Sequence, residues 1–155
     1  MTTIAYKRGI LAADSQITAG NRIITSQNAV KIVRLSDGRL LGHCGQMRHM
    51  RPLIAYLEGD STRYPDMEKD ATAIVVHVDG RVELHFGRHP DEAFEEEAEF
   101  YAIGSGSELA LGAMAMGATA IEAVNVAIRF DTSSGGEVKH LEIELPTRRL
   151  FAVDM

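Results

Sequence analysis

The chain has 155 residues, of which 45% are hydrophobic and 25% charged, so it fits one soluble domain that can bury a real core. Its net charge of −6 argues against a nucleic-acid-binding surface and an anionic membrane partner, and no apolar run approaches the ~20 residues that span a bilayer. A single cysteine excludes an internal disulfide and, without a secretory signal pattern at the N-terminus, favours a reducing cytoplasm.

The first third of the chain is expected to be mostly β-structure. Alternating β-forming residues are interrupted by two short turns, Arg8-Gly9 and Ser36-Asp37-Gly38. Residues 14–21 have turn character, because they end in Gly20-Asn21. The expected strands cover residues 2–7, 10–13, 22–25, 29–35 and 39–43.

A helix is expected next, because apolar side chains recur at helical spacing: Met47, Met50, Ile54 and Leu57. Gly59 should end this helix, and the polar residues 61–70 are predicted to form a loop.

Residues 73–78 and 81–86 predict a β-hairpin around Asp79-Gly80. A two-residue turn would pair His77 with Val82 and would place His77 and His85 on opposite faces. The acidic residues 91–99 are expected to form a solvated loop or a short exposed helix, and residues 100–103 another strand.

Two helices are expected to follow. Ser105 with Glu108, and Thr119 with Glu122, can each form a capping box at a helix start. The second helix would bury Ile121, Val124 and Ile128. Residues 131–136 are predicted to form a loop and residues 138–145 a strand, with 150–153 a candidate for a last strand. Antiparallel hairpins with helices in separate blocks indicate an α+β fold, in a single domain over residues 1–155.

Thr2 is the candidate nucleophile. If Met1 is removed, as Thr in the second position normally favours, Thr2 presents a hydroxyl and a free α-amine on the same residue. Such a residue carries its own base, which is one of the few ways in which a Thr hydroxyl becomes reactive.

Six stretches of the chain, in order, are similar to motifs of one family. They are Thr2-Thr3-Ile4-Ala5, Leu11-Ala12-Ala13-Asp14-Ser15 with Thr18-Ala19-Gly20, Val30-Lys31-Ile32, Gly42-His43-Cys44-Gly45, Ala102-Ile103-Gly104-Ser105-Gly106-Ser107 and Asp131-Thr132-Ser133-Ser134-Gly135-Gly136. In these stretches the chain resembles the proteasome β-subunits and the bacterial HslV peptidase, which are N-terminal-nucleophile hydrolases. The resemblance implies a four-layer αββα sandwich. Residues 61–70 are too short and polar for the second long helix usual in the family, so we expect a shortened outer helical layer.

The resemblance also implies a set of site residues. The implied catalytic residues are Thr2, Asp14, Lys31, Ser105, Asp131 and Ser134, with the backbone N–H of Gly42 as oxyanion donor. The implied substrate-binding residues are Thr18, Gly20, Val33, His43 and Cys44. No cofactor is expected, except that the carbonyls of Ile128, Asp131 and Ser134 could hold a structural monovalent or divalent cation.

The implied function is a threonine endopeptidase that cuts unfolded protein or peptides inside a homo-oligomeric ring or double ring, served by an AAA+ ATPase unfoldase. Two alternatives stay open. One is a non-catalytic ring-forming subunit, and the other is an amidase or acyltransferase that acts on a small molecule.

Several residues have simpler interpretations that compete with these roles. Cys44 is a rival nucleophile, but a lone cysteine is more often a small buried residue. A dinucleotide-binding loop at Gly104 would need a glycine where Leu109 stands. A histidine metal site is not expected, since no cysteines lie at ligand spacing.

Overall fold

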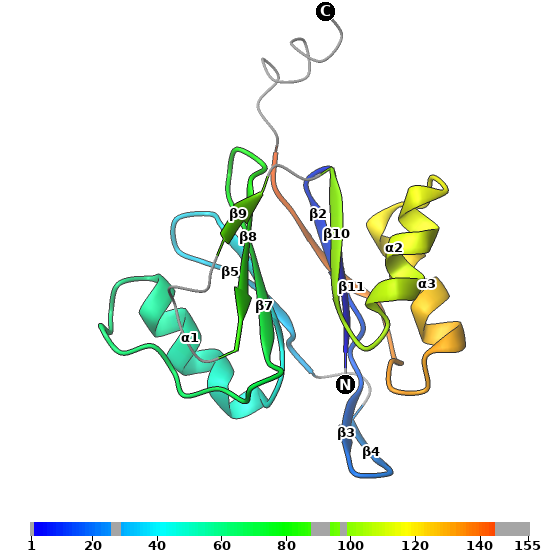
Figure 1. The fold of residues 1–155 in the computed structure, drawn as a ribbon, viewed down its shortest axis with the longest axis horizontal. Coiled ribbons are helices and arrows are strands. Elements are labelled where there is room, and N and C mark those ends of the chain that lie inside the picture. Colours follow the sequence, from blue (N-terminus) through cyan, green and yellow to red (C-terminus); the bar gives the residue numbers. More distant parts are fainter. Residues whose placement is uncertain (1, 26–28, 88–93, 97–98, 145–155) are drawn as a thin grey trace, which may run out of the picture.

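The computed structural model describes residues 2–25, 29–87, 94–96 and 99–144. Two antiparallel sheets form the centre of the molecule (Figure 1). The first has the order β10 (Phe100–Gly104), β1 (Thr3–Lys7), β2 (Ile10–Ala13) and β11 (Lys139–Glu142). The second has the order β5 (Ile32–Arg34), β6 (Leu40–Cys44), β7 (Thr72–Val76), β8 (Val82–Phe86) and β9 (Phe94–Glu96). A separate hairpin of β3 (Ile17–Ala19) and β4 (Arg22–Thr25) extends from the body.

Helices cover the outer face of each sheet. A 3₁₀ turn at Met47–His49 leads into α1 (Met50–Leu57), which packs on the second sheet, while α2 (Ser107–Ala115) and α3 (Ala120–Phe130) pack on the first (Figure 1). The predicted four-layer αββα sandwich is therefore confirmed. None of the helices in the described ranges is long and apolar enough to cross a membrane.

Three apolar clusters hold the layers together. Between the two sheets, Ile4, Leu11, Leu40 and Ile74 are fully buried. Small residues such as Ala5, Ala12 and Ala123 fill the layer under α2 and α3, and Leu41 and Leu53 belong to the layer under α1. Each burial of a large apolar side chain contributes about 1.5–3 kcal/mol.

The outer layer on the α1 side is shortened, as the sequence predicts. Residues 61–71 connect α1 to β7 and contain no helix or strand. Gly59 follows the end of α1 with a φ of 81°, which fits its predicted role. Met67 on this connection is 1% exposed, so the segment is packed against the sheet by side chains and not by a second helix.

The β7–β8 register differs from the prediction by one residue. Val76 pairs with Val82 and Ala73 with His85, because the loop is longer than two residues, with His77 N–H donating to the Arg81 carbonyl. Gly80 has a φ of 92°, which suits the left-handed position of such a hairpin loop. The slip brings His77 and His85 to the same face, where both approach Glu83, at 3.0 Å and 2.8 Å. The prediction that the two histidines face apart is wrong.

Helix starts and short strands show other differences. The predicted capping box at Thr119 and Glu122 is confirmed. The one at Ser105 is wrong, because the N-cap of α2 is Gly106 and the Ser105 hydroxyl is used elsewhere. Of the three residues predicted to be buried on α3, only Val124 is fully buried, and alanines form the rest of the buried face. The short strands β3 and β9 lie where loops were predicted. The candidate strand at 150–153 lies outside the described residues.

Candidate active site

Thr2 immediately precedes β1, which is a central strand of its sheet. Thr2 is 6% exposed and Thr3 fully buried, and Thr3 pairs with Gly104 across the β1–β10 ladder. Thr2 also lines a cavity of about 890 Å³ in the described structure. The candidate nucleophile therefore stands at the start of a central strand and at the wall of a cavity.

Asp14 connects three separate segments beside Thr2. Its Oδ1 accepts hydrogen bonds from the Thr3 N–H at 3.0 Å and from Lys31 Nζ at 3.0 Å, and its Oδ2 accepts one from the Gly135 N–H at 3.0 Å. The Lys31 and Asp14 side chains are 3% and 0% exposed. A buried ion pair is tolerated only when further hydrogen bonds satisfy it, and these backbone donors do so for Asp14.

Ser105, Asp131 and Ser134 form a second network on the other side of β1. Both hydroxyls donate to Asp131 Oδ2, at 2.7 Å and 2.6 Å, and the Ser105 oxygen also lies 3.3 Å from the Thr2 carbonyl oxygen. The Ser134 hydroxyl lies 2.7 Å from that of Thr3. Partial burial of Asp131 opposes its ionisation, but the bonds from Ser134 and Ser105 outweigh it and lower the pKa of the carboxyl.

Gly104 allows the β10 backbone to approach Thr2 closely. A Cβ atom at this position would lie 2.0 Å from the Thr2 carbonyl oxygen, and the residue has a φ of 99°. Only glycine meets both conditions. The Gly104-Ser105 dipeptide is thus required for contact with Thr2 and not merely as the entry to α2.

The structure brings the six implied catalytic side chains together but does not place Gly42 with them. Gly42 lies inside β6, paired with Ile32 on one side and Ile74 on the other, and is not part of the cavity lining. An N–H in a doubly paired strand is committed to the sheet. Gly45, which follows the strand and lines the cavity, is the better candidate for the oxyanion donor. The sequence prediction of Gly42 is corrected on this point.

The five implied substrate-binding residues divide into two groups. Thr18 and Cys44 line the cavity. Gly20 lies in the turn between β3 and β4, Val33 packs against the apolar layer under α1, and neither belongs to the lining. His43 is also absent from the lining, so the structure does not place these three residues at the cavity beside Thr2, and their role in substrate binding stays a prediction.

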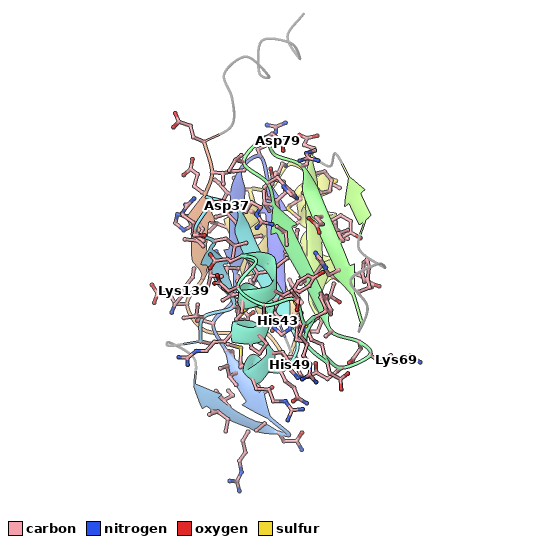
Figure 2. The ribbon with its side chains drawn as sticks, turned by 90° about the vertical axis from the view of Figure 1, so that its left-hand side faces the viewer. Asp37, His43, His49, Lys69, Asp79 and Lys139 are labelled. Carbon is pink, nitrogen blue, oxygen red and sulfur yellow. The ribbon has the colours of Figure 1, made fainter. Side chains whose placement is uncertain are left out.

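His43 faces α1 instead of the cavity. Successive strand residues point to opposite faces, so His43 lies with Leu41 on the α1 side while Cys44 faces the other way. Figure 2, which looks onto α1, has His43 and His49 at this helix. Burial lowers the pKa of His43 to about 4, with the nearby Glu68 opposing the shift. Neither ring nitrogen has a hydrogen-bond partner among the described residues.

Cys44 has the properties of a buried thiol. Burial raises its pKa to about 12, although the charge of Lys31 acts in the opposite direction. The thiolate is the nucleophilic form of cysteine, so this environment suppresses its reactivity at neutral pH. Cys44 therefore shapes the cavity wall beside Thr2 without competing with it.

A cation at the carbonyls of Ile128, Asp131 and Ser134 stays a prediction. The Asp131 carbonyl accepts a hydrogen bond from the Ser134 N–H at 3.3 Å, and Ile128 belongs to α3. Within the described ranges, no three His, Cys, Asp or Glu side chains are grouped as metal ligands.

The cavity lining includes residues for which the sequence predicted no role: Gly45 and the polar Gln16, Gln46, Glu68 and Asp70. Gln16 and Gly45 belong to or adjoin the quoted motifs and could have been found by extending the argument along them. Glu68 and Asp70 lie on the connection that replaces a helix, where no sequence pattern pointed to the site.

Comparison of the sequence with models of known protein families gives no match, and none of the curated proteins matches it. Solved structures do match. Thiobacillus denitrificans BPH, alone and in complex with epoxomicin, is 21% identical over 94% of this chain and 98% of its own, with a TM-score of 0.68. The eukaryotic HslV from Trypanosoma brucei is 22% identical over 91% of this chain and 98% of its own, also with a TM-score of 0.68. The resemblance drawn from the six motifs is thus confirmed at the level of the fold, and the chain has the HslV-like, proteasome-like fold of the N-terminal-nucleophile hydrolases.

Proposed function

We propose that this chain is a threonine endopeptidase whose nucleophile is the Thr2 hydroxyl. The observation that carries the proposal is the Asp14 network, which fixes Lys31, the Thr3 backbone and the Gly135 backbone around the residue that lines the cavity. A buried Lys–Asp pair is costly for a fold to maintain, and active sites are where such arrangements recur.

The chemistry follows from a Thr with a free amine. Once Met1 is removed, the Thr2 amine takes the proton from Oγ, directly or through a water, while Oγ attacks the carbonyl carbon of a peptide bond. The tetrahedral intermediate expels the substrate amine, which receives the proton, and leaves an ester on Oγ. Water then attacks the ester, which releases the acid and restores the hydroxyl.

The neighbouring groups support these steps in different ways. The Lys31 ammonium favours deprotonation of Thr2 and stabilises developing negative charge, while the ion pair with Asp14 fixes its position. Ser105 donates to Asp131 and is thereby held against the Thr2 backbone, with its oxygen 3.3 Å from the Thr2 carbonyl oxygen, so it helps to fix the position of the residue that carries the amine. Gly45 would offer its backbone N–H to the oxyanion, a donor of a type worth about 3–4 kcal/mol.

The proposed substrate is unfolded polypeptide, and the proposed assembly is a homo-oligomeric ring served by an AAA+ ATPase. The HslV-like fold supports this assembly. A peptidase with an open active site would act indiscriminately, and enclosure in a ring would supply the selectivity. Size-exclusion chromatography with light scattering tests the assembly: a homogeneous oligomer of six or more subunits is expected, and a monomer at micromolar concentration would refute it.

Covalent labelling tests the catalytic proposal. An epoxyketone such as epoxomicin, which is present in one BPH structure, needs both the hydroxyl and the amine of an N-terminal Thr. Intact mass should show loss of Met1 and one adduct, with the adduct mapped to Thr2. Thr2→Ala should lose the adduct and peptide hydrolysis, and Cys44→Ser should keep both.

Three outcomes would count against the proposal. Complete retention of Met1 would leave Thr2 without its base. A labelled Cys44 in the Thr2→Ala variant would transfer the role to the thiol. Labelling of Thr2 without hydrolysis of any peptide, but with hydrolysis of small amides, would favour the small-molecule amidase instead.

A further inference from the structure

The end of β6 lies directly beside Thr2. A Cβ atom on Gly104 would lie 2.0 Å from the Thr2 carbonyl oxygen and 3.2 Å from Cys44 Sγ, so the two residues meet at this glycine. Gly45 follows Cys44 and lines the same cavity as Thr2. The segment that would supply the oxyanion donor is therefore a close neighbour of the candidate nucleophile.

The register of β6 shows which way the Gly45 N–H points. The His43 N–H donates to the Lys31 carbonyl at 3.1 Å. N–H groups two residues apart in an extended strand point to the same edge, so the Gly45 N–H also faces the side of Lys31. Continuation of the β5–β6 register would pair Gly45 with Ala29, but β5 begins only at Ile32, and no backbone hydrogen bond joins these two described residues.

Gly45 has no side chain that could fix its own backbone. Glycine adopts more backbone conformations than any other residue, so the direction of its N–H depends on the contacts of its neighbours. A Cβ atom on Gly45 would lie 3.1 Å from His43 Nε2 and 3.2 Å from Ala71 Cβ. These two side chains close against Gly45 from one side and leave the peptide that follows it to be held by another contact.

Glu68 holds that following peptide. Its Oε1 accepts a hydrogen bond from the Gln46 N–H at 2.9 Å. The Gln46 carbonyl accepts a bond from the His49 N–H at 3.1 Å, where the 3₁₀ turn begins. Since Glu68 lies on the connection between α1 and β7, a distant segment of the chain fixes the backbone on the C-terminal side of Gly45.

The Glu68 carboxylate is itself held in position and ionised. Its Oε2 lies 3.4 Å from His49 Nδ1, with which it forms an ion pair when the ring is protonated. Partial burial opposes ionisation, but hydrogen bonds from its own N–H and from the Gln46 N–H, together with His49, outweigh it and keep the pKa of Glu68 below its ordinary value. An ionised acceptor forms a stronger hydrogen bond than a neutral one.

We propose that Glu68 is a positioning residue for the oxyanion donor: by holding the Gln46 N–H, it fixes the direction of the Gly45 N–H. This inference rests on the proposed peptidase function of Thr2. Loss of the contact should leave substrate binding intact and weaken stabilisation of the tetrahedral intermediate, because the oxyanion forms only during the reaction.

Two Glu68 variants test the role of the hydrogen bond. Glu68→Met keeps the length of the side chain but removes the acceptor, whereas Glu68→Gln keeps an acceptor oxygen for the Gln46 N–H. With a fluorogenic tripeptide amide and the assembled protein, kcat per Thr2 site titrated by an epoxyketone should fall about ten- to hundredfold in Glu68→Met. Glu68→Gln should stay within about threefold of the wild type, because the contact is kept. Equal losses of kcat in the two variants would overturn the proposal.

Two binding measurements show whether the effect lies in the transition state. In the Thr2→Ala background, fluorescence anisotropy should give peptide Kd values within about twofold of each other with and without Glu68→Met. A peptide aldehyde adds the Thr2 hydroxyl across its carbonyl, and the oxygen of the resulting hemiacetal takes the oxyanion position. The Ki of this aldehyde should rise in Glu68→Met by the factor by which kcat falls. Weaker peptide binding with an unchanged aldehyde Ki would overturn the proposal.

Glu58→Met is the matched control. Glu58 Oε1 accepts a hydrogen bond from the Ser36 N–H at 2.6 Å, so this variant removes the same kind of contact outside the cavity lining. Its kcat should stay within about twofold of the wild type, because the contact does not reach the oxyanion donor. A loss of kcat as large as that of Glu68→Met would assign the effect to general destabilisation and overturn the specific role.

Dependence on Thr2 separates this inference from the proposed function. If Thr2→Ala still hydrolyses the peptide, the peptidase proposal fails, and the role of Glu68 fails with it. If hydrolysis requires Thr2 and Glu68→Met keeps the wild-type kcat, only the role of Glu68 is overturned.

Discussion

Replacement of Asp14 by asparagine should be among the most destabilising single changes in this chain. The carboxylate accepts bonds from Thr3, Lys31 and Gly135 and is fully buried. In the Asp14→Asn variant, one carboxylate oxygen becomes an NH₂ group that faces a donor, and the Lys31 charge loses its partner. Breaking a buried ion pair in this way costs about 3–5 kcal/mol, a large part of a typical total stability of about 5–15 kcal/mol.

Urea unfolding with linear extrapolation measures this loss, at one fixed protein concentration because assembly would contribute to stability. For a chain of this size the corresponding drop in Tm is about 6–20 °C. Asp37→Asn is the control: Asp37 also pairs with a basic residue, Arg39, but its side chain is 54% exposed, so the cost should stay below about 1 kcal/mol.

The double variant Asp14→Asn/Lys31→Met tests whether the unpaired Lys31 charge causes the loss of stability in Asp14→Asn. Removal of the ammonium should recover about 2 kcal/mol relative to Asp14→Asn alone, since a buried pair can be replaced by apolar groups at little cost. Equal losses in the Asp14 and Asp37 variants would refute the reasoning, as would a double variant no more stable than Asp14→Asn.

Three other predictions concern pH, a turn and the thiol. His43 has a native pKa of about 4 against 6.5 in the unfolded chain, so the unfolded state binds the extra proton between these values. Stability should therefore fall by up to about 3 kcal/mol from pH 6.5 to pH 4, and His43→Phe should lack this component of the urea-unfolding pH profile. Gly80→Ala should lower the free energy of unfolding by about 1 kcal/mol because of its φ of 92°, whereas Gly112→Ala, in α2 with open space around it, should raise it by up to about 1 kcal/mol. A Cys44 pKa of about 12 leaves about one thiol in ten thousand ionised at pH 8, so an aromatic disulfide reagent should label native protein far more slowly than urea-unfolded protein. Equal labelling rates would contradict the burial.

The sequence could predict those parts of the fold that depend on local pattern. Alternation and turn residues located β1, β2, β6 and β10, and the Thr119 capping box marked the start of α3. The β7–β8 register could not be predicted in the same way, because Asp79-Gly80 fits a two-residue turn as well as a longer loop. The Asp79 carboxylate bonds to the Arg81 N–H and guanidinium, and this contact accompanies the longer loop. The Ser36-Asp37-Gly38-Arg39 turn repeats the same contacts.

The order of the motifs predicted the general position of most site residues but not the role of every one. Motif order brought Asp14, Lys31 and Ser105 to the correct neighbourhood, because these residues lie at strand ends fixed by the fold. Motif order could not distinguish Gly42 from Gly45, since both flank the same short segment and only the pairing of β6 with β5 and β7 shows which one is free of the sheet. The predicted helix cap at Ser105 failed for an analogous reason. Its hydroxyl could either cap α2 or bind another site residue, and only the folded structure shows that it donates to the distant Asp131.

The central position of β1 has a consequence for the timing of maturation. Its partner β10 begins at Phe100, and Ser134 and Gly135 complete the surroundings of Thr2 and Thr3. At about 5–20 residues per second, a ribosome needs roughly 7–27 s to reach residue 134 after it starts. During this interval Thr2 lacks the partners that bury it to 6% exposure in the folded chain. If Thr2 is the proposed nucleophile, an enzyme that must act at this residue would therefore find it more accessible before the C-terminal half of the chain has been synthesised and folded.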